Sequence, residues 1–303
     1  MLAAMGKMSV KPLTVSIVGP GNLGTALALS LSRAGYAVKV LAVRTQKRML
    51  SDTTQNLARR LKARLVVLGE TALDTDLVWI TVPDDVIGAV AAQLAATQQW
   101  RGRKVFHSSG ARTSDVLAPL RNKGARVAAV HPMMTFVHRS MPRLEGVPFG
   151  IEGDLAAVRI AKEIVGTLGA TPHLIRKENK VLYHAFGSFA SPMLIGLMAA
   201  LEQVGRAAGI KPADLKIMAA PLLRQTLGNY LEQGAAAALS GPLVRGDVAT
   251  IQRHLEALRE FPQAREVYLV LTKIAVKDLP VKNRKELERE LSGDAISPRS
   301  TRS

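Results

Sequence analysis

The sequence predicts two domains: an α/β domain on a doubly wound, mostly parallel sheet, followed by an all-α helical domain. Two observations predict the first. Short runs of Val, Ile and Leu alternate with helical segments, which is typical of a parallel sheet covered on both faces. A glycine-rich turn also joins the first apolar run to the first helix. The second domain is predicted because only helical patterns, rich in Ala, Gly, Ser and Leu, remain after Lys177.

The elements are expected in the following order. Strands are expected at residues 15–18, 37–43, 64–68, 77–82, 104–106, 126–130, 148–151 and 171–175. One long helix is expected over residues 178–208, ended by glycine and proline at 209–212, with further helices over 213–233, 247–259 and 263–277. We therefore divide the chain into a flexible leader (1–9), the sheet domain (10–177), the helical domain (178–291) and a disordered tail (292–303).

The turn Gly19-Pro-Gly-Asn-Leu-Gly24 has the features that hold the pyrophosphate of a dinucleotide. Gly19 would allow the tight turn, Gly21 would let the backbone approach phosphate, and Gly24 would let helix and strand pack closely. Asn22 and Leu23 open the helix, whose N-terminal N–H groups attract an anion. The sequence therefore predicts a Rossmann domain, and a turn with only a structural role is the alternative.

The end of the second strand indicates which dinucleotide binds. A free ribose 2′-hydroxyl favours an acidic residue about twenty positions after the glycines. Arg44 stands there instead, followed by Thr45 and Arg48. A guanidinium beside a hydroxyl suits a 2′-phosphate, so NADP(H) is predicted rather than NAD(H). The alternative is that these are solvated charges at the start of a surface helix.

Ligands of such sheets bind beyond the carboxyl ends of the strands. Val82, Pro83 and Asp84 follow the fourth strand and are expected to border the cofactor. Asp84 or Asp85 could instead cap the next helix. Ser108 follows the fifth strand, where small residues would let the nicotinamide or substrate approach the backbone.

Two histidines are expected at the same edge of the sheet. His107 ends the fifth strand and His131 ends the sixth. His131 could donate a hydrogen bond to a carboxylate or a carbonyl of a substrate. The alternative for both imidazoles is that they bond loop carbonyls and cap helices.

The start of the long helix carries the residues that we expect to take part in catalysis. Lys180, His184, Gly187 and Ser191 recur at spacings of four, three and four, which places them on one face of a helix. A hydride delivered to a carbonyl or imine carbon requires a proton donor or cation at the heteroatom, and Lys180 with His184 could supply both. Otherwise Lys180 is a solvated lysine, His184 bonds a carbonyl, and the small residues form a packing seam.

The loop before residue 247 offers a second cation. Arg245 could clamp the carboxylate of a substrate, or it could hold Asp247 and the loop itself. Asp247 is placed to cap the helix that follows.

Composition excludes several classes of protein. The chain has 303 residues and no cysteine, which rules out disulfides, thiolate nucleophiles and cysteine metal sites. The net charge of +17 would suit nucleic acid, yet aromatic residues make up only 4% and no helix-turn-helix or zinc pattern is present. No signal peptide or membrane-spanning stretch is expected. We therefore expect a cytoplasmic protein that binds neither nucleic acid nor membrane.

Several motifs together resemble a known family. They are Gly-Pro-Gly-Asn-Leu-Gly, Val-Pro-Asp-Asp, His-Ser-Ser-Gly-Ala, His-Pro-Met-Met-Thr-Phe, Tyr-His-Ala at 183–185 and Ser-Gly-Pro-Leu-Val-Arg-Gly-Asp. They resemble the bacterial family with a Rossmann-like domain followed by domain of unknown function 2520. This family looks like a branch of the 6-phosphogluconate dehydrogenase-like superfamily, alongside pyrroline-5-carboxylate reductase and ketopantoate reductase.

The resemblance implies an NADP-dependent reductase of a small anionic keto or imino acid, with ketopantoate as the first guess. It also implies an active site in the cleft between domains and a homodimer formed through the helical domain. Lys180 and His184 match the start of the long helix, where related branches place a Lys and an Asn. This chain has Pro192 where the close family has Asn, which puts the polar role of Ser191 in doubt. A catalytically silent dinucleotide sensor or interaction protein is the alternative function.

Overall fold

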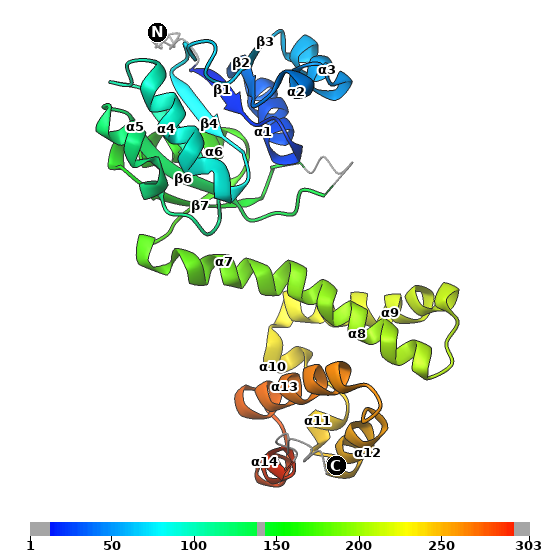
Figure 1. Cartoon of the computed structure of the whole chain (residues 1–303). Helices are drawn as coiled ribbons and strands as arrows, with labels where there is room; N and C mark the ends of the chain where they lie inside the picture. The colour runs from blue at the N-terminus through cyan, green and yellow to red at the C-terminus, as the bar shows by residue number, and fades with distance from the viewer. Residues whose placement is uncertain (1–12, 138–142, 294–303) are drawn as a thin grey trace, which may run out of the picture. The chain divides into compact units, whose positions relative to one another are not determined.

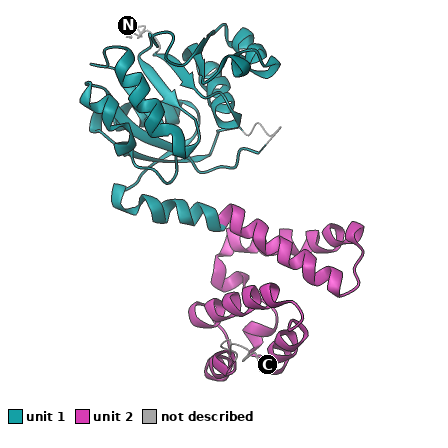
Figure 2. Ribbon diagram, in the orientation of Figure 1, with its two compact units in different colours: residues 1–189 teal, residues 190–303 magenta. Residues whose placement is uncertain are grey.

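The computed structural model describes residues 13–137 and 143–293. The chain separates into two compact units, residues 1–189 and 190–303 (Figure 2). The first unit extends beyond the boundary predicted at Lys177. It does so because the helix that follows, α7 (Lys180–Ser188), bonds to the sheet through Tyr183 and His131.

The first unit is built on one eight-stranded sheet with the order β3-β2-β1-β4-β5-β6-β7-β8 (Figure 1). Its strands are β1 (Thr14–Val18), β2 (Ala37–Val43), β3 (Arg64–Val67), β4 (Leu77–Ile80), β5 (Lys104–His107), β6 (Arg126–Pro132), β7 (Pro148–Gly153) and β8 (Thr171–Leu174). Neighbouring strands are parallel except β6 and β7, where His131 lies opposite Gly150. The predicted fold class, a mostly parallel doubly wound sheet, is confirmed.

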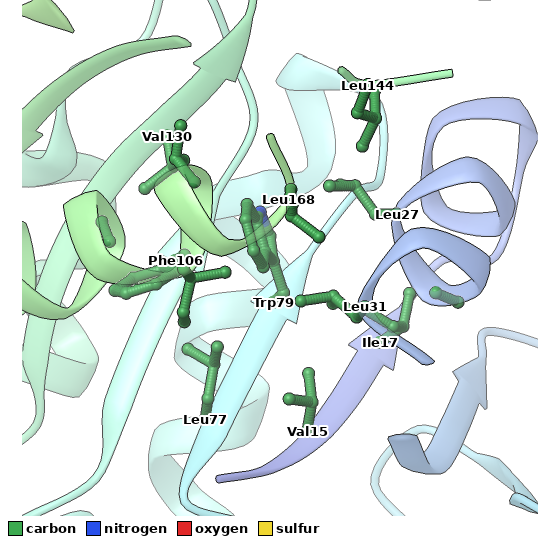
Figure 3. Close-up of a cluster of buried hydrophobic side chains, with 14 of the residues drawn as sticks. Val15, Ile17, Leu27, Leu31, Leu77, Trp79, Phe106, Val130, Leu144 and Leu168 are labelled. Carbon is green, nitrogen blue, oxygen red and sulfur yellow. The ribbon is translucent and has the colours of Figure 1, made fainter. Parts of the chain in front are cut away.

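Each face of the sheet buries its own apolar cluster. On one face α1 (Asn22–Arg33), α3 (Asp52–Leu61) and α6 (Leu155–Thr167) pack over Trp79 and Phe106, whose rings lie edge to face with centroids 5.4 Å apart (Figure 3). On the other face lie α4 (Ile87–Thr97) and α5 (Ala118–Asn122). Burial on both faces explains why the central strands are continuous apolar runs.

Short elements join these layers and shape the carboxyl edge of the sheet. They are α2 (Gln46–Met49) and the 3₁₀ turns η1 (Asp84–Val86), η2 (Ser114–Leu117) and η3 (Lys177–Asn179).

The second unit is all helical, as predicted. It contains α8 (Leu194–Ala207), α9 (Pro212–Gln233), α10 (Ala235–Ala238), α11 (Pro242–Arg245), α12 (Val248–Ala257), α13 (Pro262–Asp278) and α14 (Arg284–Gly293). Its buried core joins α12, α13 and α14 through residues such as Ile251, Leu269 and Leu287. Helix α14 was not predicted, and it includes Ser292 and Gly293 of the expected tail. The predicted leader and the rest of that tail lie outside the described residues.

The long helix predicted over 178–208 is present but irregular. A π-helical segment, Phe189–Met193, separates α7 from α8, and Pro192 lies within it. Proline has no N–H to donate to the helical ladder, and a π segment is one way in which a helix accommodates such a break. By length and apolar composition alone, residues 177–207 are the one described helix able to cross a membrane, with a mean hydropathy of 1.4.

Candidate functional site

Backbone geometry requires glycine at two of the three positions of the first turn, Gly19 and Gly24. Gly19 has φ +88°, and a Cβ there would lie 2.7 Å from Cγ1 of Val82. At Gly24 a Cβ would lie 2.5 Å from both the Gly19 carbonyl oxygen and Oγ1 of Thr81, so only glycine lets α1 pack this closely. A Cβ at Gly21 would meet nothing within 4 Å. The backbone at Gly21 therefore faces open space at the N-terminus of α1.

A pocket of about 830 Å³ lies at this turn. It is lined by seven of the predicted cofactor residues: Gly19, Gly21, Arg44, Thr45, Arg48, Val82 and Pro83. Lys47, which was not predicted, also lines it. The other predicted cofactor residues do not line the pocket. Three of them form the first turn of α1: Asn22, Leu23 and Gly24. The other two, Asp84 and Ser108, lie further along the edge of the sheet.

The lining of the pocket is strongly basic. Arg44, Lys47 and Arg48 all line it, and none forms an ion pair with a carboxylate in the described part of the chain. Thr45 caps α2, the helix that carries Lys47 and Arg48, because its Oγ1 accepts a hydrogen bond from the Arg48 backbone N–H at 3.3 Å. The pocket is thus lined both by the glycine turn and by three cations.

Asp84 links the pocket to the next loop along the sheet edge. It follows Pro83 of the pocket wall, and its Oδ2 accepts a hydrogen bond from Oγ of Ser109 at 2.6 Å. Neither Asp84 nor Asp85 caps α4 through its side chain, because Val86 is the N-cap residue. The hydroxyl of Ser108 points into the core and accepts a hydrogen bond from the Trp79 indole at 2.8 Å.

His107 is buried within the fold. Its Nε2 lies 3.2 Å from the Thr113 carbonyl, and its Nδ1 accepts a hydrogen bond from the Ser109 N–H. Of the two alternatives for His107, the structure shows the one in which it bonds a loop carbonyl. Burial, then the charge of Lys180, lowers its pKa to about 3.

His131 lies near the end of β6, in a cluster of aromatic side chains. Its Nδ1 is 3.0 Å from the hydroxyl of Tyr183, and its ring lies edge to face with those of Tyr183 and His184, with centroids 5.6 and 6.1 Å apart. Gly110 makes room for this cluster. A Cβ there would lie 2.4 Å from Cδ2 of His184 and 2.9 Å from Nε2 of His131.

Lys180 is fully buried beneath this cluster and is not a solvated lysine. Its Nζ lies 3.7 Å from Oε1 of Glu152, an ion-pair distance that is longer than a hydrogen bond. Nζ has no hydrogen-bond acceptor among the described residues. Glu152 is itself held by Ser114, whose N–H and Oγ donate to its two carboxylate oxygens at 2.7 and 2.8 Å.

Burial controls the protonation of these groups. It is the largest cause that lowers the pKa of Lys180, and the charges of Glu152 and Asp84 oppose it. Burial, then the charges of Lys180 and His184, lowers the pKa of His131 to about 4. Burial raises the pKa of Tyr183 to about 12. His131 and Tyr183 are therefore both uncharged at neutral pH.

Three site residues were not predicted from the sequence as candidates. Glu152 is a lone carboxylate within the apolar run of β7, and this is a signal that could have been recognised. Tyr183 was noted only as part of a motif, although it precedes His184 on the same helix. Ser114 carries no sequence signal, because only the fold brings it to Glu152.

Two predicted site residues belong to the second unit. Ser191 lies in the π-helical segment, and its side chain has no hydrogen-bond partner among the described residues. Arg245 ends α11 and is exposed, and Asp247 caps α12 by accepting from the Thr250 N–H at 3.0 Å. The catalytic roles of Ser191 and Arg245 stay predictions.

Two family models match this chain. A Rossmann-like domain matches residues 3–132, and the domain of unknown function 2520 (DUF2520) matches residues 147–274. No curated protein matches the sequence.

Solved structures share the fold at low sequence identity. A protein from Bacteroides fragilis described as a proposed NADP oxidoreductase has 20% identity and a TM-score of 0.71, covering 88% of this chain and 98% of its own. A reductive aminase from Aspergillus terreus, in complex with NADPH and ethyl levulinate, has 17% identity and a TM-score of 0.62 over 92% and 99%. A pyrroline-5-carboxylate reductase from Coxiella burnetii has 16% identity and a TM-score of 0.56 over 87% and 98%.

At these identities the likeness establishes the fold alone. The two family models together span most of the sequence, in the order that the motifs predicted. The chain therefore matches a Rossmann-like domain followed by a DUF2520 domain, which is the arrangement that its motifs resemble.

Proposed function

We propose that this protein is an NADP(H)-dependent oxidoreductase that reduces the C=O or C=N bond of a small anionic keto or imino acid. The main support is one continuous edge of the sheet. Pro83 lines the basic glycine pocket, Asp84 follows it and bonds Ser109, and the adjacent Gly110 lies against His131 and His184. A dinucleotide site and a cluster of proton-handling side chains thus adjoin each other, as Rossmann-type sites require.

The residues of the pocket fit the cofactor. Gly21 leaves the backbone open to a pyrophosphate at the N-terminus of α1. Arg44 and Arg48, with Lys47 beside them, would hold a ribose 2′-phosphate, for which a dianion and a guanidinium are well matched. Bound NADPH would supply a hydride to the electrophilic carbon of the substrate.

The protein must then stabilise charge on the substrate heteroatom and let a proton reach it. His184 is exposed, whereas Lys180 is fully buried and cannot touch a ligand in this conformation. We therefore assign proton delivery to His184 or to water, and the product carries one added hydride and one added proton.

The substrate class rests on charge and on the similar proteins. The excess of 17 positive charges favours anionic ligands. One similar structure is named as a reductase of an imino acid, and another holds a keto ester beside NADPH. Ketopantoate and pyrroline-5-carboxylate are the first compounds to test. Arg245 of the second unit remains a candidate for the carboxylate, and nucleic acid and membranes are not proposed as partners.

We further propose a homodimer formed through the helical unit. Helix α9 exposes a series of large apolar side chains: Ile217, Met218, Leu222, Tyr230 and Leu231. Several of them are more than two-thirds exposed, which is costly for a 22-residue helix in water. A second copy of the same helix would cover them.

Turnover separates a reductase from a catalytically silent sensor, which is the second candidate function. Oxidation of NADPH would be followed at 340 nm with each keto or imino acid, and His184→Ala should lower the rate by about tenfold or more. Arg253→Ala, which changes an exposed cation of α12, is a control that should leave the rate unchanged. Binding of NADPH without turnover of any keto or imino acid would favour the sensor instead.

A further inference from the structure

We propose that His131 meets the substrate heteroatom through its Nε2–H group, as a hydrogen-bond donor oriented by Tyr183. This inference rests on the proposed function for the identity of its ligand. It assigns Lys180 the part of a positioning residue, in place of the proton donor expected from the sequence.

The orientation follows from the contact between Tyr183 and His131. The Tyr183 hydroxyl is 3.0 Å from Nδ1, and its alternative acceptor, the His131 carbonyl oxygen, is further away at 3.4 Å. A hydroxyl that gives its single proton to Nδ1 leaves the imidazole proton on Nε2. Tyr183 keeps that proton, because burial raises its pKa to about 12.

Nε2 is the side of the ring that a ligand can reach. No described residue forms a hydrogen bond with Nε2, and His131 is only half-buried. Gly110 borders it, and a Cβ at Gly110 would lie 2.9 Å from Nε2. The loop of Gly110 continues from Ser109, which bonds Asp84 next to the cofactor pocket. A heteroatom near Nε2 would therefore lie on the cofactor side of the sheet edge.

The titratable groups around His131 come from several elements. On α7 these are Lys180, Tyr183 and His184; on β5 there is His107; and Glu152 of β7 and Asp84 after β4 act on Lys180. After burial, Lys180 is the largest influence that lowers the pKa of His131. Glu152 is fixed by two hydrogen bonds from Ser114, so its carboxylate is stabilised and can hold the Lys180 ammonium in the core.

A neutral imidazole suits the chemistry better than a charged one. It polarises a carbonyl or imine by hydrogen bonding without a charge that would bind the substrate carboxylate in the wrong place. It cannot easily give up its proton, so the proton that completes the reduction comes from His184 or water. Lys180 acts through His131 and does not need to contact the ligand.

The test is nuclear magnetic resonance of the ligand-free protein with labelled histidine. The chain has six histidines, and His131→Gln identifies the His131 signal by its loss. In the parent protein His131 should remain neutral from pH 8 down to about pH 5, with the proton on Nε2. Tyr183→Phe should mix the two tautomers while the fold is retained.

The role of Lys180 is tested by removing the charge. Lys180→Met leaves Glu152 unpaired in the core and can unfold the protein, so the double variant Lys180→Met, Glu152→Gln is measured alongside it. In folded Lys180→Met the His131 pKa should rise by about one unit or more, and in the double variant, which also removes the opposing charge of Glu152, it should rise by less. A control variant, Lys177→Met, removes an exposed cation paired with Asp115 and should leave the His131 pKa unchanged.

Three results would overturn the inference: a charged His131 at pH 7, a proton on Nδ1, or an unchanged pKa in the folded double variant. None of these depends on turnover. A failure to oxidise NADPH with any substrate would contradict the proposed reaction. The histidine measurements would still test the protonation state and tautomer of His131.

Discussion

Gly21→Ala should weaken cofactor binding and Gly24→Ala should lower stability, although the two positions are about one helical turn apart. At Gly21 the backbone already has φ −77° and ψ −157°, which alanine can adopt, and the added Cβ would meet nothing within 4 Å. The folded state should lose no more than about 1 kcal/mol, the usual cost of alanine at an N-cap position. The new methyl group would instead occupy the space that a pyrophosphate needs, so NADPH affinity should fall by at least about tenfold, or about 1.4 kcal/mol.

Gly24→Ala should instead destabilise the fold. The Cβ would lie 2.5 Å from the Gly19 carbonyl oxygen and 2.5 Å from Oγ1 of Thr81, which itself bonds that carbonyl at 2.7 Å. Overpacking of this kind costs about 1–3 kcal/mol, and a lost hydrogen bond adds about 1 kcal/mol. The higher helix propensity of alanine returns about 1 kcal/mol, so the net loss is about 1–3 kcal/mol.

Thermal unfolding and NADPH fluorescence titration measure the two effects separately. Gly24→Ala should lower Tm by about 2–4 °C for each kcal/mol lost, and Gly21→Ala should barely move it. Either of two results would refute these roles: NADPH binding by Gly21→Ala as tight as by the parent protein, or a fully stable Gly24→Ala.

Three further predictions concern the site and the helical unit. Gly110→Ala should displace His131 and His184 and lower turnover by about tenfold or more, as measured by steady-state kinetics. Gly166→Ala changes a helical glycine with open space at its Cβ, and it should stabilise the fold by up to about 1 kcal/mol, as measured by Tm. Acid should destabilise the first unit, because His107 and His131 have folded pKa values of about 3 and 4 and an unfolded pKa near 6.5, so the unfolded chain binds more protons below pH 6.5. The loss is about 2 kcal/mol for each histidine at pH 5 and is measured by urea unfolding at pH 7 and 5; equal stability at both pH values would contradict it. Leu222→Glu on α9 should weaken the proposed dimer in light scattering, and a monomeric parent protein would remove that proposal.

Local patterns predicted the first domain well. The second strand has the predicted bounds, Ala37–Val43, because buried valine, leucine and alanine side chains make up most of the run between Gly35 and Arg44. The roles of Gly19 and Gly24 were also predicted, since each follows from backbone geometry at a strand-to-helix turn.

Contacts between distant segments could not be predicted in this way. Helical spacing placed Lys180 beside His184, but it could not show that Lys180 turns into the core toward Glu152, which comes from a strand that runs antiparallel to β6. Ser191 was placed on the same face as Lys180 on the assumption of a regular α-helix. The π segment around Pro192 changes the spacing after Ser188, so that assumption does not hold there.

Helix α14 was missed because its amino-acid composition does not indicate a helix. Residues 284–293 are mostly charged, and in isolation they have little reason to fold. Leu287 and Leu291 lie one turn apart and complete the buried core of the second unit, so tertiary packing stabilises a helix that composition alone does not indicate.

The measurement that tests the central proposal most directly is titration of the purified protein with NADPH and with NADH, repeated with Arg44→Asp. We expect NADPH to bind more tightly, and Arg44→Asp to weaken NADPH by about tenfold or more while NADH affinity changes little, because only NADPH carries the 2′-phosphate that Arg44 would hold. Lys39→Asp, at an exposed position on β2 outside the pocket, should leave both affinities unchanged. Absence of binding by either dinucleotide would contradict the proposed function.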